Sequence, residues 1–483
     1  MSAIVLPADV TIGSATATER ASATSSRTDL LLHGPIVWTL LRLASPNILV
    51  MLAQAATGLI ETYFVARLGV DALAGMALVF PGFMLMQMIS AGAMGGGISS
   101  AIARAIGAGR RDEADALVVH GIVIHVALGL FFTVVMLAFG EPIYRALGGR
   151  GGELAAALAY SNVVFAGNIF IWILNALASA IRATGNMLVP ALVICVGVVV
   201  LVPLSPCLIF GIGPLPALGI AGGGVALVLF NVAGTAVLGW YVLSGRNAAR
   251  LRFAPLRWSH IRSIFGVGAW SSISSVQTNV IIAVATALAA SVAGADAVAG
   301  YGTGARLEYL LIPLVFGLGA PLVAMVGTNI GAGQRERALR IGLAGGAIAF
   351  VITEVIGIAT AIWPQAWLAL FSGDAHVIEA GSAYLRAVGP FYGFYGLGLS
   401  LYFASQGAGR LFWPLAAGFL RMAVALGGGY FAVRMTGSLT WLFVALALGL
   451  LVQGTSVLAA ILSGAWFSGD GRIKRSNSRP VKD

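Results

Sequence analysis

The segment RAIGAGRRDEA, residues 104–114, returns in altered form as TNIGAGQRERA, residues 328–338, at a shift of 224 positions. The same shift carries three further residues onto residues of their own type, namely Tyr160 onto Tyr384, Gly185 onto Gly409 and Pro190 onto Pro414. One shift that holds at such separated points indicates an internal repeat, and a repeat of this length decides the architecture. The chain therefore consists of two related halves.

The composition indicates a membrane protein with many spans. Of the 483 residues, 59% are hydrophobic and only 10% are charged, and the mean hydropathy is +0.94. A typical soluble domain carries roughly 25% charged residues, so these charges are too few to coat a soluble protein of this size. Glycine is abundant, but no Gly-X-Y period is present, which excludes a collagen-like chain.

Apolar runs between charged or Pro/Gly punctuation predict twelve transmembrane helices, since a bilayer crossing needs about 20 apolar residues. The first half would hold helices at 36–66, 73–102, 115–140, 154–181, 187–211 and 220–243, and the second half at 261–290, 299–329, 338–363, 380–405, 412–434 and 440–467. Six is an even number, so both halves would enter the membrane from the same side. The expected fold is all-α, with two six-helix lobes around a central cavity, a recognised transporter design.

These spans divide the chain into five regions. We expect a disordered cytoplasmic tail at 1–33, an N-lobe at 34–243, a basic cytoplasmic linker at 244–260, a C-lobe at 261–467 and a basic cytoplasmic tail at 468–483.

The basic residues predict the orientation. Twenty-one of the 28 Lys and Arg residues fall on the side of the N-terminus, four fall on the opposite side, and Arg306, Arg386 and Arg421 lie within spans. Because cytoplasmic loops are enriched in Lys and Arg, both termini should be cytoplasmic in a multi-pass inner-membrane protein. The net charge of +10 then reflects this topology, and we expect no nucleic-acid partner.

Neither a cofactor site nor an enzyme active site is predicted. The two cysteines, Cys195 and Cys207, lie in apolar stretches and offer no metal-ligand spacing. No arrangement of a nucleophile with a His base stands out, so we expect a protein that is not an enzyme and that holds no cofactor or metal.

Three carboxylates stand out because they fall inside predicted spans, namely Glu61, Glu308 and Glu354. A charged side chain at mid-membrane costs about 2.5–3.5 kcal/mol even on the lenient insertion scale, so each needs a reason. Glu354 has no polar stripe around it and is interpreted as a helix-packing contact. Glu308 could bind a cation or lock helices together with an arginine, and the sequence leaves both alternatives open.

Glu61 lies on a polar stripe of the first span. Gln54 precedes it by two helical turns on the same face, with Thr57 between them. Pro46 lacks an amide hydrogen and would kink this helix, so the stripe could line a cavity. The alternative is that Glu61 simply snorkels or pairs with Arg67.

Other polar residues within spans are candidates for lining a substrate cavity. Asn168 and Asn175 lie two turns apart on one face of the fourth span, and Gln277 with Thr278 forms a polar spot in the seventh. Arg306 lies two residues from Glu308 and so points to a different face of the helix. Hydrogen bonding between helices is the alternative for these amides, since such residues do this routinely.

The stretch from Pro46 to Gly69, the repeated IGAG segments and YGTGARLEYLLIPLVFGLG, residues 301–319, resemble the multidrug and toxic compound extrusion (MATE) family. The resemblance covers residues 35–465. It implies a V-shaped pair of six-helix lobes and export of organic, often cationic, compounds in exchange for protons or sodium ions. It also implies that Glu61, Gln54 and Asn175 take part in coupling to the ion and that Pro46 is the helix kink.

The sequence departs from the family pattern at two places. Ser205, before Pro206, stands where the family often has an Asp, so the first lobe has one membrane carboxylate instead of a pair. Acidic residues that one branch carries in the seventh and tenth helices are absent near Gln277 and Tyr395. This pattern favours the DinF-like branch, in which coupling resides in the first lobe.

We therefore expect a secondary active multidrug antiporter that works by alternating access, with Glu61 as the coupling carboxylate and a proton, or a sodium ion, as the coupling ion. Small organic molecules would be its substrates, the lipid bilayer its surroundings and the monomer its working unit, with Ser205, Thr57 and the amides above near the substrate. The main alternative is a flippase for lipids or lipid-linked oligosaccharides, and an alternative of another class is a channel or a membrane scaffold.

Overall fold

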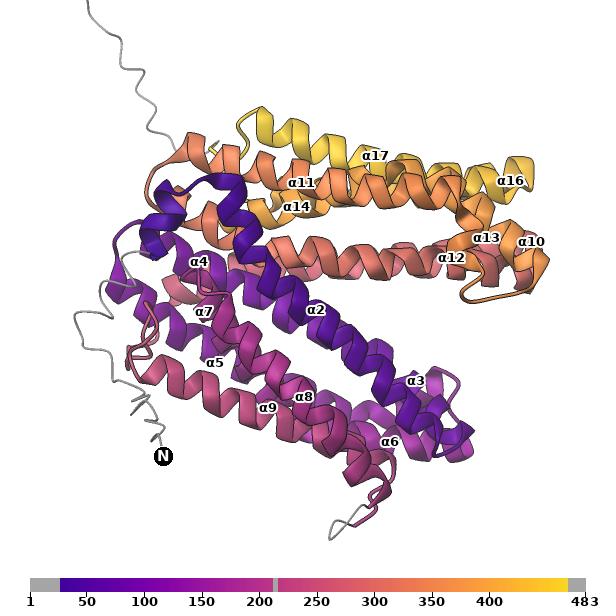
Figure 1. Ribbon diagram of the computed structural model, residues 1–483, viewed down its shortest axis with the longest axis horizontal. Helices are drawn as coiled ribbons and strands as arrows, with labels where there is room; N and C mark the ends of the chain where they lie inside the picture. Colours follow the sequence, from indigo (N-terminus) through magenta and orange to yellow (C-terminus); the bar gives the residue numbers. More distant parts are fainter. Residues whose placement is uncertain (1–26, 212–215, 468–483) are drawn as a thin grey trace, which may run out of the picture.

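Two groups of helices diverge from a common end and give the protein the shape of a V (Figure 1). The computed structural model describes residues 27–211 and 216–467, and within these ranges it is helical with no strand. Ten of the described helical segments are long and apolar enough to cross a membrane, or eleven if one bent pair counts as a single span. This agrees with the expected all-α fold in two lobes, although one expected crossing does not pass that test.

The N-lobe is built from the first half of the chain. Its helices are α2 (Ile36–Ala66), α3 (Val70–Gln87), the π-helical η1 (Met88–Met94), α4 (Gly95–Gly107), α5 (Arg111–Ala146), α6 (Gly151–Ala166), α7 (Asn168–Ala183), α8 (Leu188–Phe210) and α9 (Ile220–Leu243). One straight helix was expected over 154–181, but the chain bends by 49° between α6 and α7. The intervening Gly167 is the point at which the helix breaks.

The C-lobe is built from the second half. Its helices are α10 (Trp258–Gly331), α11 (Arg335–Ile362), α12 (Pro364–Leu368), α13 (Ala375–Val388), the 3₁₀ turn η2 (Gly389–Phe391), α14 (Tyr392–Ala408), α15 (Phe412–Met422), the π-helical η3 (Ala423–Gly428), α16 (Gly429–Thr436) and α17 (Leu439–Leu462). The crossing expected over 380–405 is the one that does not pass as a span, because η2 interrupts it at Pro390, which cannot donate a helical hydrogen bond.

The helix α10 differs from the two separate helices that were expected at 261–290 and 299–329. It runs for 74 residues without a break in helical hydrogen bonding, and a straight helix of that length would extend about 110 Å. Yet both its beginning, at Ile264, and its end, at Thr328, approach the short helix α4. The helix must therefore reverse direction, and its two apolar segments, Trp258–Val292 and Val298–Gly331, are two crossings.

The linker between the lobes is fastened to α5. The structure is non-helical over 246–257, and two side chains of α5 accept hydrogen bonds from backbone amides in this segment. Asp115 Oδ1 accepts from the amide of Arg250 at 2.7 Å, and His120 Nε2 accepts from the amide of Arg257 at 2.8 Å.

The expected disordered tail is wrong in its last part. Residues 27–33 form a helix. Its Leu31 side chain packs into a hydrophobic core and is only 1% exposed, which stabilises the helix. The side-chain amide of Asn329 donates to the Leu31 carbonyl oxygen at 3.0 Å, which ties this helix to the C-lobe. The remainder of the expected tails, 1–26 and 468–483, lies outside the described residues.

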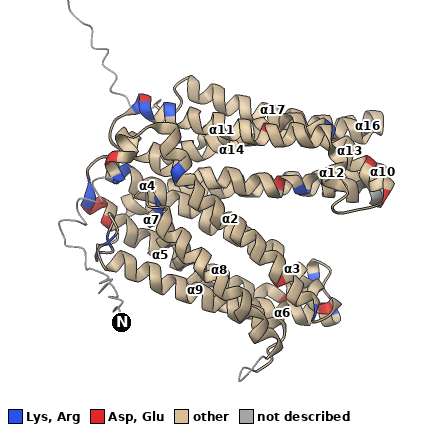
Figure 2. Cartoon of the chain, in the orientation of Figure 1, with Lys and Arg blue, Asp and Glu red and all other residues tan. Residues whose placement is uncertain are grey.

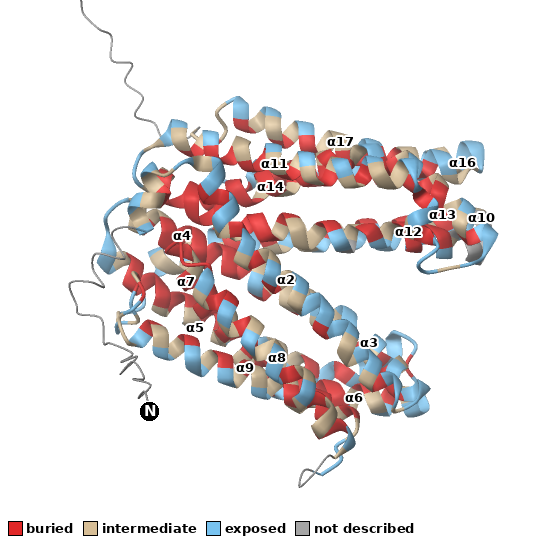
Figure 3. Cartoon of the chain, in the orientation of Figure 1, coloured by how far each residue is buried: buried red, intermediate tan, exposed pale blue. Residues whose placement is uncertain are grey.

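Each lobe begins with a helix whose first turns are buried in the other lobe. Leu40 and Ala44 of α2, with Leu31 of the preceding helix, belong to a core cluster whose other buried residues come from the C-lobe, whereas Ile264 of α10 belongs to the core of the N-lobe. The shift of 224 relates Leu40 to Ile264, so the exchange is reciprocal. The N-lobe expected at 34–243 is therefore not a separate packing unit. Buried residues gather at this joined end (Figure 3).

The exchange predicts that α2 stabilises the C-lobe. Leu40 is fully buried, so Leu40→Ala should lower the free energy of unfolding by about 2–5 kcal/mol, the usual cost of a large-to-small change in a core. Thermal unfolding of the purified protein in detergent measures the effect. Leu41→Ala is the matched control, since Leu41 is adjacent in the sequence but its side chain is 42% exposed. Equal losses in the two variants would contradict the buried position of Leu40.

Candidate functional site

Glu61 lies in the last third of α2, far from the joined end, and its side chain is half-buried. Its Oε1 atom is inaccessible and has no hydrogen-bond partner among the described residues. The Arg67 guanidinium instead lies over the Tyr63 ring, 4.8 Å from its centroid. A carboxylate that is removed from water without a partner is unfavourable, so this oxygen needs a proton or a cation to complete its surroundings.

Tyr160 and Ser205 are two further polar side chains that are buried in the N-lobe. The Tyr160 hydroxyl of α6 is within electrostatic range of the Glu61 carboxylate. A Cβ atom placed on Gly223 of α9 would lie 3.8 Å from the Tyr160 ring and 3.9 Å from Ser205 Oγ of α8. Ser205 Oγ is itself buried without a hydrogen-bond partner among the described residues. Glu61 Oε1 and Ser205 Oγ are thus two of several buried oxygen atoms in the N-lobe that have no hydrogen-bond partner among the described residues.

The other two residues of the polar stripe on α2, Gln54 and Thr57, differ in their exposure to solvent. Thr57 is buried and donates to the Ala53 carbonyl oxygen of its own helix at 2.8 Å, whereas Gln54 is exposed. Pro46 lies within α2, which continues through it. The Asn47 amide next to it donates to the Gly317 carbonyl oxygen of α10 at 3.3 Å, so the two lobes meet at this proline.

The asparagines of α7 belong to a separate cluster. The Asn175 amide donates to Gln87 Oε1 at 3.1 Å and to Ser90 Oγ at 3.0 Å, which ties α7 to the π-helical segment η1. Asn168 is fully buried and donates to the Gly129 carbonyl oxygen of α5 at 3.0 Å. Among the described residues, no hydrogen bond joins either amide to the Oε1 atom of Glu61.

Glu308 lies in very different surroundings in the C-lobe. The Tyr384 hydroxyl donates to Glu308 Oε1 at 3.1 Å and lies 3.2 Å from the Tyr392 hydroxyl. The buried Arg421 guanidinium is within electrostatic range of the Glu308 carboxylate and donates to Gln453 Oε1 at 2.9 Å. A phenol and a cation thus balance this carboxylate, as in the alternative in which Glu308 locks helices together.

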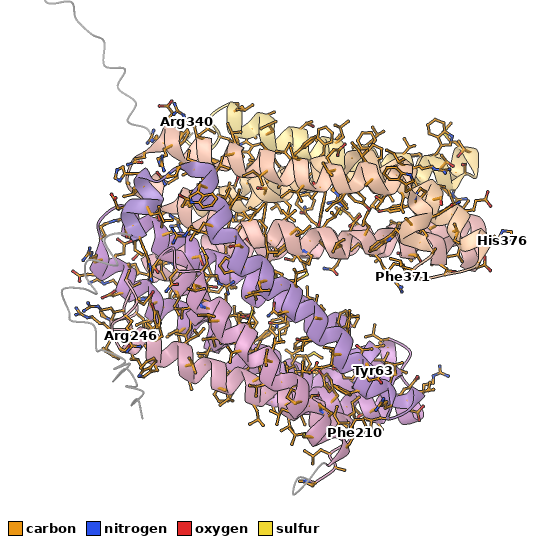
Figure 4. All side chains as sticks on the ribbon, in the orientation of Figure 1. Tyr63, Phe210, Arg246, Arg340, Phe371 and His376 are labelled. Carbon is orange, nitrogen blue, oxygen red and sulfur yellow. The ribbon has the colours of Figure 1, made fainter. Side chains whose placement is uncertain are left out.

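The remaining candidates of the C-lobe are engaged in local contacts. The Gln277 amide donates to the Leu415 carbonyl oxygen at 3.5 Å and Thr278 to that of Ser274 at 3.2 Å. Arg306 is exposed and lies 5.4 Å from the centroid of the Phe371 ring. Phe371 lies near the outer end of the C-lobe arm, and Tyr63 lies on the N-lobe arm (Figure 4).

Glu354 serves as a packing contact. Its Oε2 atom accepts from the backbone amide of Gly393 at 2.6 Å, in the first turn of α14. A carboxylate is favourable at a helix N-terminus because the free amides there carry partial positive charge.

The sequence interpretation missed the role of two tyrosines, although it contained the signal that identifies them. Tyr160 and Tyr384 are related by the shift of 224: Tyr384 donates to Glu308, and Tyr160 lies within electrostatic range of Glu61. The glutamates are not related by this shift, because Glu61 lies in the first helix of its lobe and Glu308 in the second crossing of the other. The repeat therefore preserves the tyrosine and changes the carboxylate.

Comparison with known proteins identifies the family. The MatE family model matches residues 46–207 and 271–431, two segments that start 225 and end 224 residues apart, as the repeat requires. The FAD transporter of Shewanella oneidensis is 28% identical over 380 residues, which cover 78% of this chain and 82% of that protein. The probable multidrug resistance protein NorM of Thermotoga maritima is 25% identical over 438 residues, which cover 88% and 92% of the two chains.

Solved structures show the same fold. A crystal structure of MATE in complex with MaD3S superposes with a TM-score of 0.82 at 24% identity and covers 90% of this chain and 98% of that chain. A transporter of the MOP superfamily from Pyrococcus furiosus gives a TM-score of 0.81 at 25% identity over 90% and 96% of the chains. The family match covers well over half of the sequence, so this chain belongs to the MatE family of membrane transporters, as its resemblance to the multidrug and toxic compound extrusion proteins indicated.

Proposed function

We propose that this transporter is a multidrug efflux antiporter, which exports organic, often cationic, compounds in exchange for protons by alternating access of its two lobes. The observation that carries the proposal is the buried Oε1 atom of Glu61, which lies within a membrane span and has no hydrogen-bond partner among the described residues. Relatives that are named as multidrug proteins, including NorM of Thermotoga maritima and MepA of Staphylococcus aureus, support the substrate class.

The charge distribution supports an orientation with both termini in the cytoplasm. Most of the Lys and Arg residues of the described chain gather at the joined end of the V, and few lie at the ends of the arms (Figure 2). Because positive loops remain on the cytoplasmic side, the joined end would face the cytoplasm and the arms would open outward. The protein would then work as a monomer in the inner membrane of a bacterium.

In the proposed cycle, protonation and substrate binding at the N-lobe exclude one another. Taking a carboxylate out of water favours its neutral form, so Glu61 would accept a proton while the arms are open to the acidic outside. Protonation would release a cationic substrate held by the carboxylate. Tyr160 and Ser205 would surround the protonated group, and its proton would leave to the cytoplasm once the lobes have rearranged.

One carboxylate is sufficient to drive useful export. Exchange of one proton for one monovalent cation moves no net charge, so the pH difference drives it, at about 1.4 kcal/mol or a ten-fold concentration ratio for each pH unit. We favour the proton over sodium because a sodium ion needs several oxygen ligands. Glu61 has one carboxylate, and the nearest sequence candidate for a second, Ser205, is a hydroxyl.

A substrate that carries negative charge is the second candidate, and the exposed Arg306 beside Phe371 is the observation that favours it. The relative from Shewanella oneidensis is named as a FAD transporter, and flavin dinucleotides combine an aromatic ring with phosphates. A flippase for pyrophosphate-linked lipids would need more cationic side chains. Of the three arginines within the expected spans, Arg421 is buried and bonded to Gln453, which leaves the exposed Arg306 and Arg386.

Reconstitution in liposomes tests the proposal. Proton and sodium gradients are imposed separately on vesicles that contain the purified protein, and the movement of a fluorescent organic cation and of FAD is followed in each case. We expect the fluorescent cation to move when a proton gradient is imposed and not when a sodium gradient is imposed. Movement driven by sodium alone, or movement of FAD without movement of the cation, would overturn the coupling ion or the substrate class.

Glu61→Gln should abolish proton-driven efflux while the protein remains folded, because an amide cannot release the proton that the cycle requires. Glu61→Asp should retain part of the activity. Glu141→Gln is the matched control, since that carboxylate is exposed at the far end of α5 and pairs with Arg145. Full proton-driven transport by folded Glu61→Gln would eliminate Glu61 as the coupling group.

Glu308→Gln should keep proton coupling and lose stability. The Gln oxygen can still accept from Tyr384, but Arg421 loses the neighbouring negative charge, and an unbalanced buried charge is costly. We expect a lower unfolding temperature in detergent together with an unchanged response to the proton gradient. Loss of coupling in a folded Glu308→Gln protein would instead show that a coupling group lies in the C-lobe.

A further inference from the structure

We infer that Gly107 and Gly331, the first glycines of the two IGAG segments, form the gate that closes the transporter at the joined end of the V. The inference rests on the proposed function in one respect, because it takes the joined end to be the side that opens to the cytoplasm. Its evidence, however, is a contact between the two lobes that involves neither Glu61 nor the substrate.

At this gate, backbone lies directly against backbone. A Cβ atom placed on Gly107 would overlap the carbonyl oxygen of Thr328 and lie 2.7 Å from its carbonyl carbon. A Cβ atom placed on Gly331 would overlap the carbonyl oxygen of Arg104 and lie 2.8 Å from its carbonyl carbon. Real Cβ atoms essentially never come this close, so only glycine fits at either position.

The contact is symmetric. Gly331 follows Thr328 by three residues, Gly107 follows Arg104 by three residues, and the shift of 224 relates each member of one pair to its counterpart. Gly107 therefore contacts the carbonyl group of Thr328, one turn before Gly331, and Gly331 contacts the carbonyl group of Arg104, one turn before Gly107. This geometry places the crossing of α4 and α10 on the pseudo-twofold axis between the lobes, where one close contact can serve both halves.

The two glycines of each IGAG segment have different tasks. Gly109 and Gly333 adopt the left-handed conformation, with φ of +73° and +76°, and end their helices. A Cβ atom at either of these would meet nothing within 4 Å. A helix exit therefore explains only the second glycine of each segment. Close helix approach through small residues is a common way to join membrane helices, and it explains the first.

Polar contacts from the N-lobe strengthen the same junction on one side. The Ser100 hydroxyl and the Arg104 guanidinium each donate to the Gly407 carbonyl oxygen at 3.2 Å. Gly407 belongs to the last turn of α14, where free carbonyl groups favour a cation. Gln406 returns a hydrogen bond to the Gly92 carbonyl oxygen at 3.2 Å. The position that corresponds to Arg104 is Thr328, so this clamp exists in one half only.

Alternating access requires that this contact break. The arms diverge away from the joined end (Figure 1), so a path to the cytoplasm can open only if α4 separates from the end of α10. A methyl group at either glycine would hold the two backbones apart, and the closed arrangement would lose population relative to one that is open at this end.

The test measures the separation of the lobes directly. Spin labels are attached at Asp112→Cys and Glu336→Cys, two exposed positions that the shift of 224 relates, in full-length protein with Cys195 and Cys207 replaced by alanine. Gly107→Ala and Gly331→Ala, each alone, should shift the distance distribution to longer values. Gly266→Ala in α10 is the matched control, because a Cβ atom there meets nothing within 4 Å, and it should leave the distances unchanged.

The measurement requires neither a substrate nor an ion gradient, so its outcome is independent of the role proposed for Glu61. An unchanged distribution in folded Gly107→Ala and Gly331→Ala proteins would overturn the gate. If neither variant folds, a second test keeps both Gly107 and Gly331 and cross-links the two lobes beside them. A short cross-link between Ala108→Cys and Ala332→Cys should stop transport until it is cleaved. Transport that continues in the cross-linked protein would equally overturn the inference.

Discussion

Two helices cross at the joined end of this transporter so closely that no side chain fits between them, and the positions of both arms follow from that crossing. Within a bilayer, lipid is as apolar as a leucine side chain, so helices associate through close packing and hydrogen bonds more than through hydrophobic burial. Gly107 and Gly331 provide the close packing, and the contacts of Ser100 and Arg104 with Gly407 provide the hydrogen bonds. Beyond this region the arms separate, and α2 carries Glu61 about 22 Å past Pro46.

The two lobes use similar parts for opposite purposes. In each lobe a tyrosine at the same repeat position lies within electrostatic range of a glutamate, and in the C-lobe the two are hydrogen-bonded. In the C-lobe the glutamate is balanced by Arg421 and bonded to Tyr384, so its charge is compensated in place. In the N-lobe the glutamate has no cation, and one of its oxygens has no partner among the described residues. A carboxylate of the second kind can exchange a proton at less cost than one of the first kind, because no buried cation loses its neighbouring negative charge.

Much of the fold could be predicted from hydropathy and from the repeat, because both follow local rules. The bounds expected for the first helix agree with α2, and the repeat agrees with the two segments of the family match. The bend at Gly167, the continuous helix α10 and the order of residues 27–33 depend on tertiary packing, which no single stretch of sequence contains. The candidate site likewise has one part that follows local rules and one part that depends on tertiary packing. Glu61 was visible as an isolated charge, whereas the distance between Asn175 and Glu61 depended on which helices are neighbours.

The exchange of first helices bears on how such a chain could have arisen. A six-helix unit on its own would leave the first turns of its leading helix without the core that covers Leu40 in one half and Ile264 in the other. A gene that encoded one half would therefore have needed two copies of its product, entwined as in a domain-swapped dimer. Duplication and fusion of that gene would have converted an exchange between two subunits into an exchange within one polypeptide. The halves could then diverge, so that one has a carboxylate without a compensating charge among the described residues and the other a carboxylate near an arginine.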